Sequence, residues 1–363
     1  MDISKIDKNF ILDANIPVDD LAWYNAAEKT FDLYGGFHDE NGYYRMPRDI
    51  AAEVSEGVSV LNNHTAGIRV RFKTNSPYIA ICVKWDCYSP MNHMAASGSS
   101  GFDLYKVKNG LHRFVASFMV ANCNPQKNAD GFTAFKYLNT PDKNGYSEGE
   151  LADYILNFPL YNGVRELYIG IKNDSALEVG NKYKNNLPVV FYGSSITQGG
   201  CASRPGNCYQ NFISRALDID YINLGFSGNG KAEDTMVEYL KSLKMSIFVS
   251  DYDHNAPNAE HLQNTHYKLY EKIRAVNPNL PYVIISKPDY HHKCDWERRA
   301  IIFETFKKAM ALGDENVYFI DGASLFGGDE SDACTVDGTH PNDLGFYRMA
   351  EGITPIIKHI LSR

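Results

Sequence analysis

The chain has 363 residues, of which 44% are hydrophobic and 22% are charged. These values are ordinary for a globular protein and exclude a disordered chain, and the length predicts roughly two domains of ~150 residues each. The formal net charge of −8 disfavours nucleic acid and anionic membranes as partners, because both bind to basic protein surfaces.

The N-terminal residues and the cysteines bear on where the protein works. After Met1 we find no basic segment followed by an apolar run, so the sequence does not predict a signal peptide. No apolar run reaches the ~20 residues of a membrane span. We therefore expect a cytoplasmic protein, unless a leader was removed before export. The seven Cys form no CxxC pair, which disfavours a structural zinc site. We expect free thiols, with a Cys201–Cys208 bridge as the alternative in an exported protein.

Residues 1–180 are predicted to form β-structure. Short segments in which apolar and polar residues alternate, bounded by turn residues, predict strands at 68–72, 78–83, 102–107, 114–118, 154–158 and 167–171. Asn109-Gly110 joins two of these strands as a hairpin turn. Many short strands without a long helical pattern favour a β-sandwich of the jelly-roll type.

Residues 186–363 follow a different pattern, in which apolar strands alternate with helices. Strands are predicted at 189–192, 221–224, 246–249, 282–285 and 317–320. The later strands are followed by apolar residues at helical spacing, in three sets: Leu262, His266, Leu269, Ile273 and Val276; Phe303, Phe306 and Met310; Phe346, Met349, Ile353 and Ile356. The alternation predicts a five-stranded parallel sheet wrapped by helices, and such sheets bind ligands beyond the carboxyl ends of their strands.

The first of these strands ends in Gly193-Ser194-Ser195, with Gly199 four residues further on. Glycine permits a tight turn and a close approach of the backbone, so Ser195 stands where a strand end can present a nucleophile. A strand followed by Gly and Ser is also common without any chemistry, so this segment by itself decides nothing.

The ends of three further strands carry glycine or charge. Residues 223–230 are glycine-rich, and a phosphate-binding loop is the alternative there, although no Gly-Lys-Ser/Thr sequence follows. Residues 251–255 hold two carboxylates, a His and Asn255, and a metal site is the alternative there, although no second cluster stands at ligand spacing. His291 and His292 beside Asp289 are expected to form a cleft rim or a solvated loop.

Asp337 and His340 stand three residues apart, just before the last predicted helix. A tight loop or one helical turn would put both side chains on one side, so that the carboxylate holds one ring nitrogen and the other faces a substrate. This is the pair of base and orienting group that a serine nucleophile needs. The alternative is a purely structural role at the start of the helix.

Together the four segments resemble the sequence blocks of the SGNH (GDSL-type) hydrolase superfamily. The matching residues, in block order, are Gly193-Ser194-Ser195 with Gly199; Asn223, Gly225 and Ser227-Gly228; Asp253-His254-Asn255; and Asp337 with His340. Two positions depart from the family pattern, since Ser194 replaces the usual Asp and Asp253 replaces a Gly. In the first half, residues 101–105 (Gly-Phe-Asp-Leu-Tyr) resemble the GxDLY signature of the β-domain that precedes some SGNH esterases.

The resemblance implies a jelly-roll-like β-sandwich domain over 1–180 and a flavodoxin-like three-layer α/β/α catalytic domain over 186–363. It implies that Ser195 is the nucleophile, His340 the base and Asp337 the residue that orients the base. It further implies an oxyanion hole made by the backbone N–H groups of Ser195 and Gly228 and the side-chain amide of Asn255. It implies no metal and no cofactor.

The expected function is hydrolysis of a short-chain ester, most simply acetyl on a carbohydrate, because the predicted strand-end segments are polar and a lipase needs a large apolar surface. The expected partner is therefore a small-molecule or oligosaccharide ester. Alternatives are a lipase, thioesterase or acyltransferase of the same superfamily, and a carbohydrate-binding protein with an inactive hydrolase domain. The β-domain is expected to wall the cleft, with a sugar-binding module as the alternative. The long loop at 89–95 either reaches the cleft or only connects two strands. The sequence does not indicate an oligomeric state.

Overall fold

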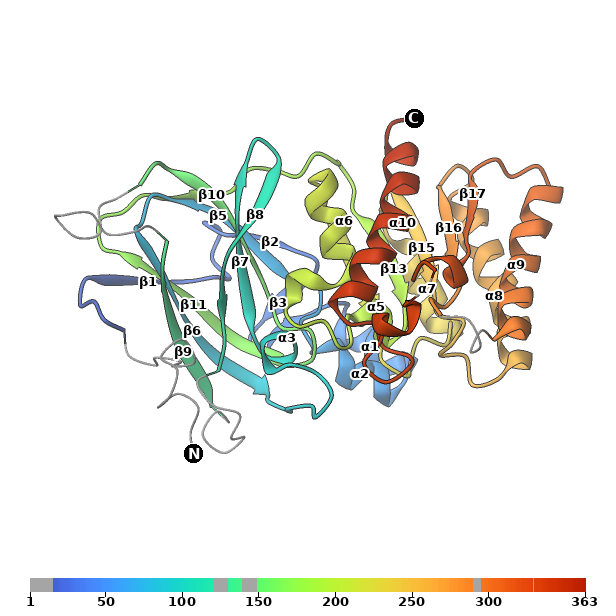
Figure 1. Ribbon diagram of the computed structural model, residues 1–363, viewed down its shortest axis with the longest axis horizontal. Helices are drawn as coiled ribbons and strands as arrows, with labels where there is room; N and C mark the ends of the chain where they lie inside the picture. The colour runs from blue at the N-terminus through green and yellow to red at the C-terminus, as the bar shows by residue number, and fades with distance from the viewer. Residues whose placement is uncertain (1–15, 121–129, 139–148, 290–294, 329) are drawn as a thin grey trace.

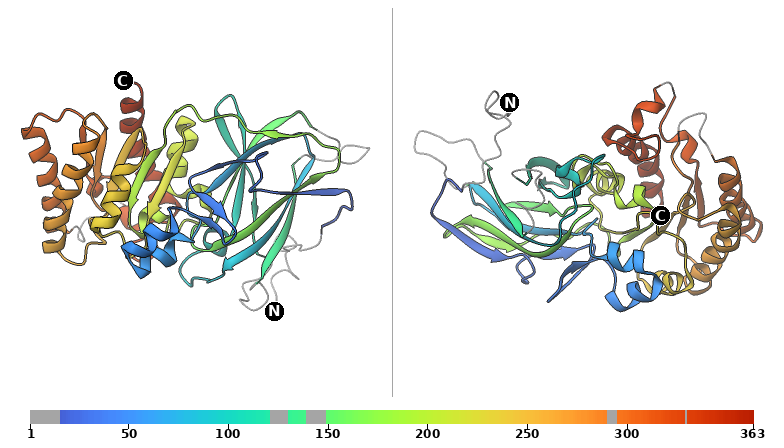
Figure 2. Two further views of the ribbon diagram at one scale, coloured as in Figure 1. Left: turned by 180° about the vertical axis from the view of Figure 1, so that it is seen from behind. Right: turned by 90° about the horizontal axis from the view of Figure 1, so that it is seen from below.

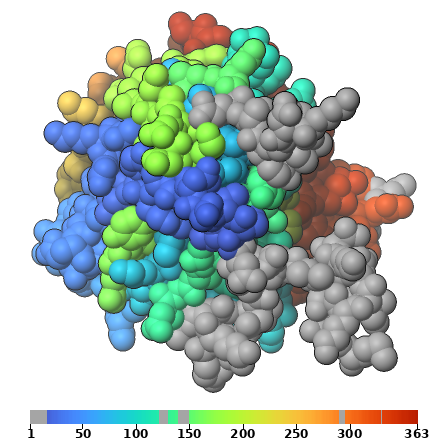
Figure 3. Space-filling view, turned by 90° about the vertical axis from the view of Figure 1, so that its left-hand side faces the viewer, coloured from blue at the N-terminus to red at the C-terminus, as the bar shows by residue number. Residues whose placement is uncertain are grey.

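The computed structural model describes residues 16–120, 130–138, 149–289, 295–328 and 330–363. It shows two parts side by side: antiparallel sheets from the first half of the chain, and a parallel sheet flanked by helices from the second half (Figure 1). Seen from the end of the first part, the earliest described residues, in dark blue, cross its outer surface (Figure 3). Within the described stretches, no helix has the length and apolar character needed to cross a membrane.

Two antiparallel sheets form the first part. One has the order β1 (Leu21–Asn25), β11 (Gly163–Lys172), β6 (Tyr78–Cys87) and β9 (Gly131–Tyr137). The other has the order β12 (Leu177–Val179), β5 (Arg69–Thr74), β10 (Ala152–Asn157), β7 (Phe102–Lys108) and β8 (Leu111–Phe118), with β2 (Asp32–Tyr34) also paired to β5. Alternate residues of both sheets share one core, as Ile79 and Ile81 of β6 do with Val70 and Phe72 of β5. The predicted β-sandwich is confirmed, although β1, β2, β9 and β12 were not among the predicted strands.

Two helices of the first half pack against the second half of the chain. They are α1 (Arg48–Val54) and α2 (Glu56–Asn62), and they follow the hairpin of β3 (Phe37–Asp39) and β4 (Gly42–Tyr44). Ala51 of α1 and Val58 of α2 share a core cluster with Val190 and Tyr192 of the parallel sheet. Figure 2 shows both helices, in light blue, beside the α/β part and away from the antiparallel sheets.

The parallel sheet of the second part has the order β14 (Tyr221–Gly225), β13 (Val189–Gly193), β15 (Ile247–Asp251), β16 (Tyr282–Ile285) and β17 (Val317–Ile320). In order of appearance along the chain this is 2-1-3-4-5, the flavodoxin-like order. The predicted five-stranded parallel sheet is therefore confirmed. The strand order reverses between β13 and its two neighbours, so the cleft that such sheets use for ligands opens where β13 ends.

Helices cover both faces of this sheet. One face carries α6 (Tyr209–Leu217) and α10 (Asp343–Leu361), whose Ile213 and Phe346 share a core cluster with Val189 and Phe191 of β13. The other face carries α7 (Asp234–Ser242), α8 (Ala259–Val276) and α9 (Trp296–Ala311). The result is a three-layer α/β/α arrangement, as predicted.

Two details of the predicted helix faces are wrong. In α9 the buried positions are Ile302, Thr305 and Ala309, whereas Phe303 and Met310 are exposed. Phe303 instead packs edge-on against Phe319 of β17, the outermost strand. In α8 the last residue, Val276, is also exposed.

Buried arginines of the first half bind backbone groups of the second half. The Arg45 guanidinium donates to the carbonyl oxygens of Gly225 at 2.5 Å and Asn223 at 3.3 Å, so it caps the end of β14. Arg69 donates to the Tyr221 carbonyl at 3.1 Å. Since β14 leads directly into the glycine-rich loop of the predicted site, the first half of the chain supports the strand end from which that loop starts.

Asp103, the acidic residue of the GxDLY-like segment, is fully buried and also joins the two halves. Its Oδ2 accepts hydrogen bonds from the Gly206 N–H at 2.8 Å and from Arg204 at 2.9 Å. Its Oδ1 accepts a hydrogen bond of 2.9 Å from Asn157. The segment therefore anchors the loop that precedes α6 onto the β-sandwich.

Candidate active site

The turn that carries Ser195 is held by its own hydrogen bonds. Ser194 is the N-cap of the short helix α5 (Ser195–Gln198), and its hydroxyl accepts a hydrogen bond of 3.1 Å from the Ile196 N–H. The Ser194 N–H donates to Oγ1 of Thr197 at 3.2 Å, which completes a reciprocal cap. A Cβ on Gly193 would lie 2.1 Å from that same Oγ1, so only glycine permits the turn. Ser195 thus starts a helix at the carboxyl end of β13.

Ser195, His340 and Asp337 form one chain of hydrogen bonds. Oγ of Ser195 lies 2.9 Å from Nε2 of His340, and Nδ1 of His340 lies 2.7 Å from Oδ2 of Asp337. The other carboxylate oxygen, Oδ1, accepts hydrogen bonds from the backbone N–H groups of His340 at 2.8 Å and Thr339 at 3.0 Å. The structure therefore brings together the three residues that the sequence predicts to act as a triad.

The Asp337 carboxylate fixes the tautomer of His340. Partial burial opposes ionisation of Asp337, but the hydrogen bonds from the His340 backbone and ring outweigh it and lower the pKa of Asp337 to about 2. An ionised carboxylate accepts only, so Nδ1 of His340 carries the proton and Nε2 presents its lone pair to the Ser195 hydroxyl. This is the orientation that a general base requires.

The predicted oxyanion-hole residues lie on two loops at the same edge of the sheet. Gly228 has a φ of +67°, a left-handed conformation that favours glycine, and a Cβ there would meet open space. In the described chain we find no acceptor for the Gly228 N–H. Oδ1 of Asn255 accepts a hydrogen bond of 3.3 Å from the Gly230 N–H, which fixes the side-chain amide and leaves its nitrogen as a donor.

The glycine-rich loop is fastened to the nucleophile turn by Gln198, a residue that the sequence analysis did not single out. Its Oε1 accepts a hydrogen bond of 3.0 Å from the Ser227 N–H, next to Gly228. Its Nε2 lies 3.2 Å from Nδ1 of His64 in the first half of the chain. Burial, with a smaller contribution from Arg45, lowers the pKa of His64 to about 3, so this imidazole is neutral and accepts the hydrogen bond.

Asp253, which replaces a family glycine, braces the loop that presents Asn255. It is buried, and its Oδ1 accepts hydrogen bonds of 2.8 Å from both the backbone N–H and Nδ1 of His254. Its Oδ2 accepts a hydrogen bond of 3.0 Å from the Lys287 N–H. Burial alone would raise the pKa of Asp253, but these donors lower it below its usual value.

Two groups of side chains within the described residues have donor atoms close enough to hold a metal ion. Asp251, Asp253 and His254 form one, the cluster for which the sequence left a metal site open, with ligand atoms within 4.8 Å of one another. Both oxygens of Asp253 already accept hydrogen bonds, one from His254 and the other from the Lys287 N–H after β16, so the geometry favours a structural role for this cluster. The second group is His93, Cys201 and His340.

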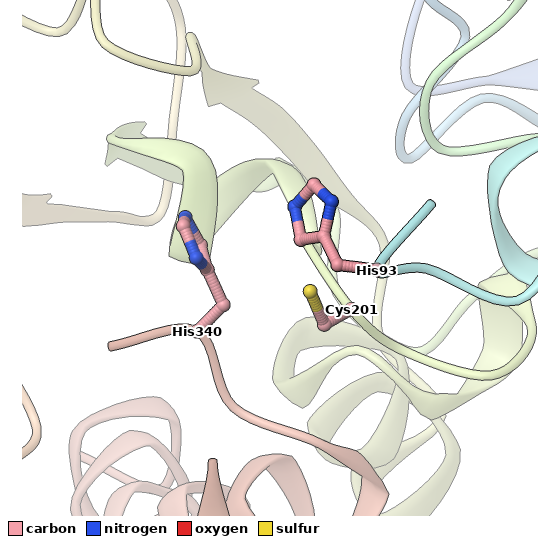
Figure 4. A group of neighbouring side chains, drawn as sticks. All are labelled: His93, Cys201 and His340. Atoms are coloured by element: carbon pink, nitrogen blue, oxygen red, sulfur yellow. The ribbon is translucent and has the colours of Figure 1, made fainter. Parts of the chain in front are cut away.

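The loop at 89–95 reaches the site from the β-sandwich, as its length allowed. Met94 belongs to the core cluster of the α/β part, and Met91 packs against that cluster. The exposed His93 that they hold has its ring centroid 6.0 Å from that of His340 (Figure 4). Buried Tyr161, also from the first half, donates a hydrogen bond of 3.2 Å to the Ser195 carbonyl.

Two other sequence predictions concern His and Cys residues. His291 and His292 lie outside the described residues. Cys201 and Cys208 are free thiols, so the alternative of a bridge between them is wrong, and Cys82, Cys87 and Cys334 are free as well.

Models of two protein families match the chain, one in each half. The model of the GDSL-like lipase/acylhydrolase family matches residues 186–358, and the model of the N-terminus of SGNH-hydrolase-type esterases, named GxDLY, matches residues 21–177. The chain is a two-domain SGNH hydrolase. Both halves of the sequence-based assignment are therefore confirmed, and this SGNH hydrolase is an enzyme that acts on ester bonds.

Solved structures support the fold of this SGNH hydrolase over nearly its whole length. A candidate GDSL-like lipase from Bacteroides ovatus ATCC 8483 is 28% identical, with a TM-score of 0.79 over 94% of this chain and 98% of the other. A salicylyl-acyltransferase from a tetracycline biosynthetic pathway is 16% identical, with a TM-score of 0.74 over the same shares. An acetyl xylan esterase from the rumen bacterium Butyrivibrio proteoclasticus is 13% identical, with a TM-score of 0.58 over 95% and 99% of the two chains. Among curated proteins, none matches the sequence significantly.

Proposed function

We propose that this SGNH hydrolase is a serine esterase that removes short acyl groups, acetyl above all, from a carbohydrate. The observation that carries the proposal is the continuous chain of hydrogen bonds from Asp337 through His340 to Ser195. In a binding protein with an inactive hydrolase domain, we would not expect these three polar side chains to keep this hydrogen-bonded arrangement.

The reaction follows from the positions of these groups. The Ser195 hydroxyl attacks the ester carbonyl while Nε2 of His340 takes its proton, and the resulting imidazolium is stabilised by Asp337. The tetrahedral oxyanion is bound by the backbone N–H groups of Ser195 and Gly228 and by the Asn255 amide. His340 then gives its proton to the departing alcohol, and a water molecule, activated by the same imidazole, releases the acid from Ser195.

The choice of a short acyl group rests on the surroundings of Ser195. Gly200 packs so closely that a Cβ on it would lie 2.9 Å from the Tyr161 hydroxyl and 3.4 Å from the His340 ring, so the backbone after α5 lies directly against two side chains next to the nucleophile. The nearby groups on the glycine-rich and Asn255 loops are polar. An acetyl xylan esterase shares the fold and supports a carbohydrate as the alcohol.

Two substrate series test the proposal. Rates on p-nitrophenyl esters are measured from two to twelve acyl carbons, and acetate release is measured from acetylated oligosaccharides. We expect the rate to fall steeply with acyl length and acetate to be released from the sugars, and Ser195→Ala serves as the inactive control. A flat or rising profile with chain length would instead favour a lipase or a thioesterase.

The same experiment separates hydrolysis from acyl transfer. Each reaction is repeated with and without an unacetylated sugar acceptor, and the products are identified by mass spectrometry. An esterase gives free acetate in both cases, whereas an acyltransferase gives a new acetylated sugar. No turnover and no burst of p-nitrophenol from the folded wild-type protein would leave a carbohydrate-binding protein as the remaining function.

A further inference from the structure

Three side chains with strong affinity for soft metal ions meet beside Ser195. They are His93 from the loop at 89–95, Cys201 from the segment after α5, and His340, and one donor atom of each lies within 4.8 Å of the other two. Figure 4 shows the Cys201 sulfur directed into the space between the two imidazole rings. The proposed esterase mechanism uses only His340 of these three.

The backbone holds Cys201 in this position. Its φ of +75° is in the left-handed region, which is rare for a residue other than glycine, and it follows the close-packed Gly199-Gly200 pair. The residue is buried, and its thiol is free. A strained backbone persists only where the surrounding structure enforces it, so the main chain at Cys201 is held in place with its side chain beside the two rings.

The two imidazoles offer their nitrogens to the same space. Nδ1 of His93 lies 3.1 Å from Oδ1 of Asn92, so the neutral ring donates there and keeps the lone pair of Nε2 free for another partner. Nδ1 of His340 is held by Asp337, which leaves Nε2 as its available nitrogen. A carboxylate behind a metal-binding His is the usual arrangement that orients such a ligand.

This set of donors matches zinc. Zn²⁺ binds imidazole nitrogen at ~2.0 Å and thiolate sulfur at ~2.3 Å in tetrahedral geometry, so its donor atoms stand roughly 3.3–3.6 Å apart. Starting from separations of at most 4.8 Å, the donors need to close by up to about 1.5 Å, and the exposed His93 side chain can supply that movement by rotation. Hard cations such as Mg²⁺ prefer oxygen and are not expected to bind.

We propose that His93, Cys201 and Nε2 of His340 form a binding site for Zn²⁺ that reversibly inhibits the enzyme, with the fourth position open to water. On binding, the Cys201 thiol releases its proton to solvent, and the thiolate, the two neutral imidazoles and the water complete the tetrahedron. The metal occupies the lone pair that faces the Ser195 hydroxyl, so His340 cannot accept the serine proton. The inhibition rests on the proposed esterase function, whereas the metal binding does not.

Cobalt spectroscopy tests the site without any catalytic reaction. Co²⁺ substitutes for Zn²⁺, and a cobalt–thiolate bond gives an absorption band in the near ultraviolet together with strong visible bands of a tetrahedral ion. We expect these bands when Co²⁺ is added to metal-free protein, and we expect Zn²⁺ to abolish them by displacement. They should be lost in Cys201→Ser and kept in Cys82→Ser, a matched change of a free thiol on β6 of the β-sandwich. Bands that persist in Cys201→Ser, or none in the wild type, would overturn the proposal.

Inhibition is measured separately on aryl-ester turnover, and each variant is compared with its own metal-free rate. Zn²⁺ should inhibit the wild type, EDTA should restore the rate, and Mg²⁺ should have no effect. Cys201→Ser and His93→Ala should each raise the half-inhibitory Zn²⁺ concentration by at least ~10-fold, the smallest loss typical when an outer partner of a metal site is removed. His359→Ala, a change of an exposed His in the last turn of α10, should leave it unchanged. Equal inhibition of all variants would place the metal elsewhere, whereas cobalt bands in a protein without esterase activity would leave the site standing and refute the proposed function.

Discussion

The Thr197 hydroxyl donates a hydrogen bond of 2.9 Å to Oδ2 of Asp251, and this contact ties the turn that carries Ser195 to the end of the neighbouring strand β15. The Tyr209 hydroxyl of α6 donates to the same oxygen at 3.2 Å. Asp251 is fully buried, and its Oδ1 has no partner among the described residues. The Asp251 carboxyl group therefore holds the nucleophile turn in place. Burying it costs more folding free energy when it is ionised than when it is protonated.

That cost predicts a pH-dependent effect of Asp251→Asn. Burial raises the pKa of Asp251 from 3.8 to about 7, so between these pH values the folded wild type keeps a proton that the unfolded chain releases. The wild type consequently loses stability as the pH rises through this window, and Asn has no proton to lose. Relative to wild type, Asp251→Asn should gain up to about 1.4 kcal/mol per pH unit between pH 4 and 7 and no more above pH 7. Urea unfolding of both proteins at pH 4.5, 6 and 8 checks this, and a difference independent of pH would contradict it.

The two adjacent serines should respond differently to alanine. Ser195→Ala removes the nucleophile and should lower kcat by ~10⁴-fold or more without affecting the fold. Ser194→Ala removes the N-cap of α5, which costs about 1 kcal/mol of stability, and should retain most of the activity. Turnover per folded molecule and thermal unfolding are measured on the same samples. A larger loss of kcat in Ser194→Ala than in Ser195→Ala would show that Ser195 is not the nucleophile.

Asp337 and His340 should behave as one unit. Asp337→Asn removes the carboxylate that holds the Nδ1 proton, and a loss of roughly 10³–10⁴ in kcat is expected, with His340→Ala costing at least as much. The double variant should be little worse than His340→Ala, because residues that act on the same step are not additive. If the two losses multiply, the residues do not share a step.

Two titratable groups of the site, Asp337 and His64, should not cause an acid limb in the pH–rate profile above pH 4. The pKa of Asp337 is about 2 and that of His64 about 3, so both keep one protonation state at every pH above ~4. An acid limb of kcat above pH 4 should therefore persist in His64→Gln, because Asp251, whose pKa burial raises to about 7, still titrates in that range. A limb that disappears in this variant would show that His64 titrates.

Asn255→Ala should act on the transition state alone. Loss of one oxyanion donor typically costs ~10²–10³ in kcat, and KM should change little because the ground-state carbonyl does not depend on that donor. Asn255→Asp keeps the size of the side chain but removes the N–H donor, so it is the matched control. Recovery of the rate in Asn255→Asp would mean that the amide only supports the Gly230 N–H.

The sequence predicted the parallel sheet because its strands follow local rules, and it singled out the three residues of the proposed triad because their segments resemble the family blocks. Each strand of the sheet is a short apolar run, and the residues of the triad stand immediately after strands or before a helix. The sequence was a poorer guide to α9, where Phe303 and Met310 fit a helical spacing but are exposed. Periodicity shows which apolar side chains share a helix face, but it does not show which face another element covers.

Contacts between distant segments lay beyond the sequence. Gln198 and His64 are 134 residues apart, and nothing in either segment announces their hydrogen bond. The same holds for His93, whose loop stood out by its length while its position beside His340 depends on how Met91 and Met94 dock onto the α/β core. Such pairs are fixed by the packing of the two halves and not by local pattern.

The docking of the loop at 89–95 has an evolutionary consequence. The proposed reacting groups all come from the second half of the chain, whereas the loop beside them comes from the first, so substitutions in the loop should change the surroundings of Ser195 while leaving its hydrogen bond to His340 in place. Two proteins with identical sequence blocks in the second half could therefore differ in substrate through this loop alone. A gene library confined to residues 89–95 would sample new specificities while keeping the chemistry constant.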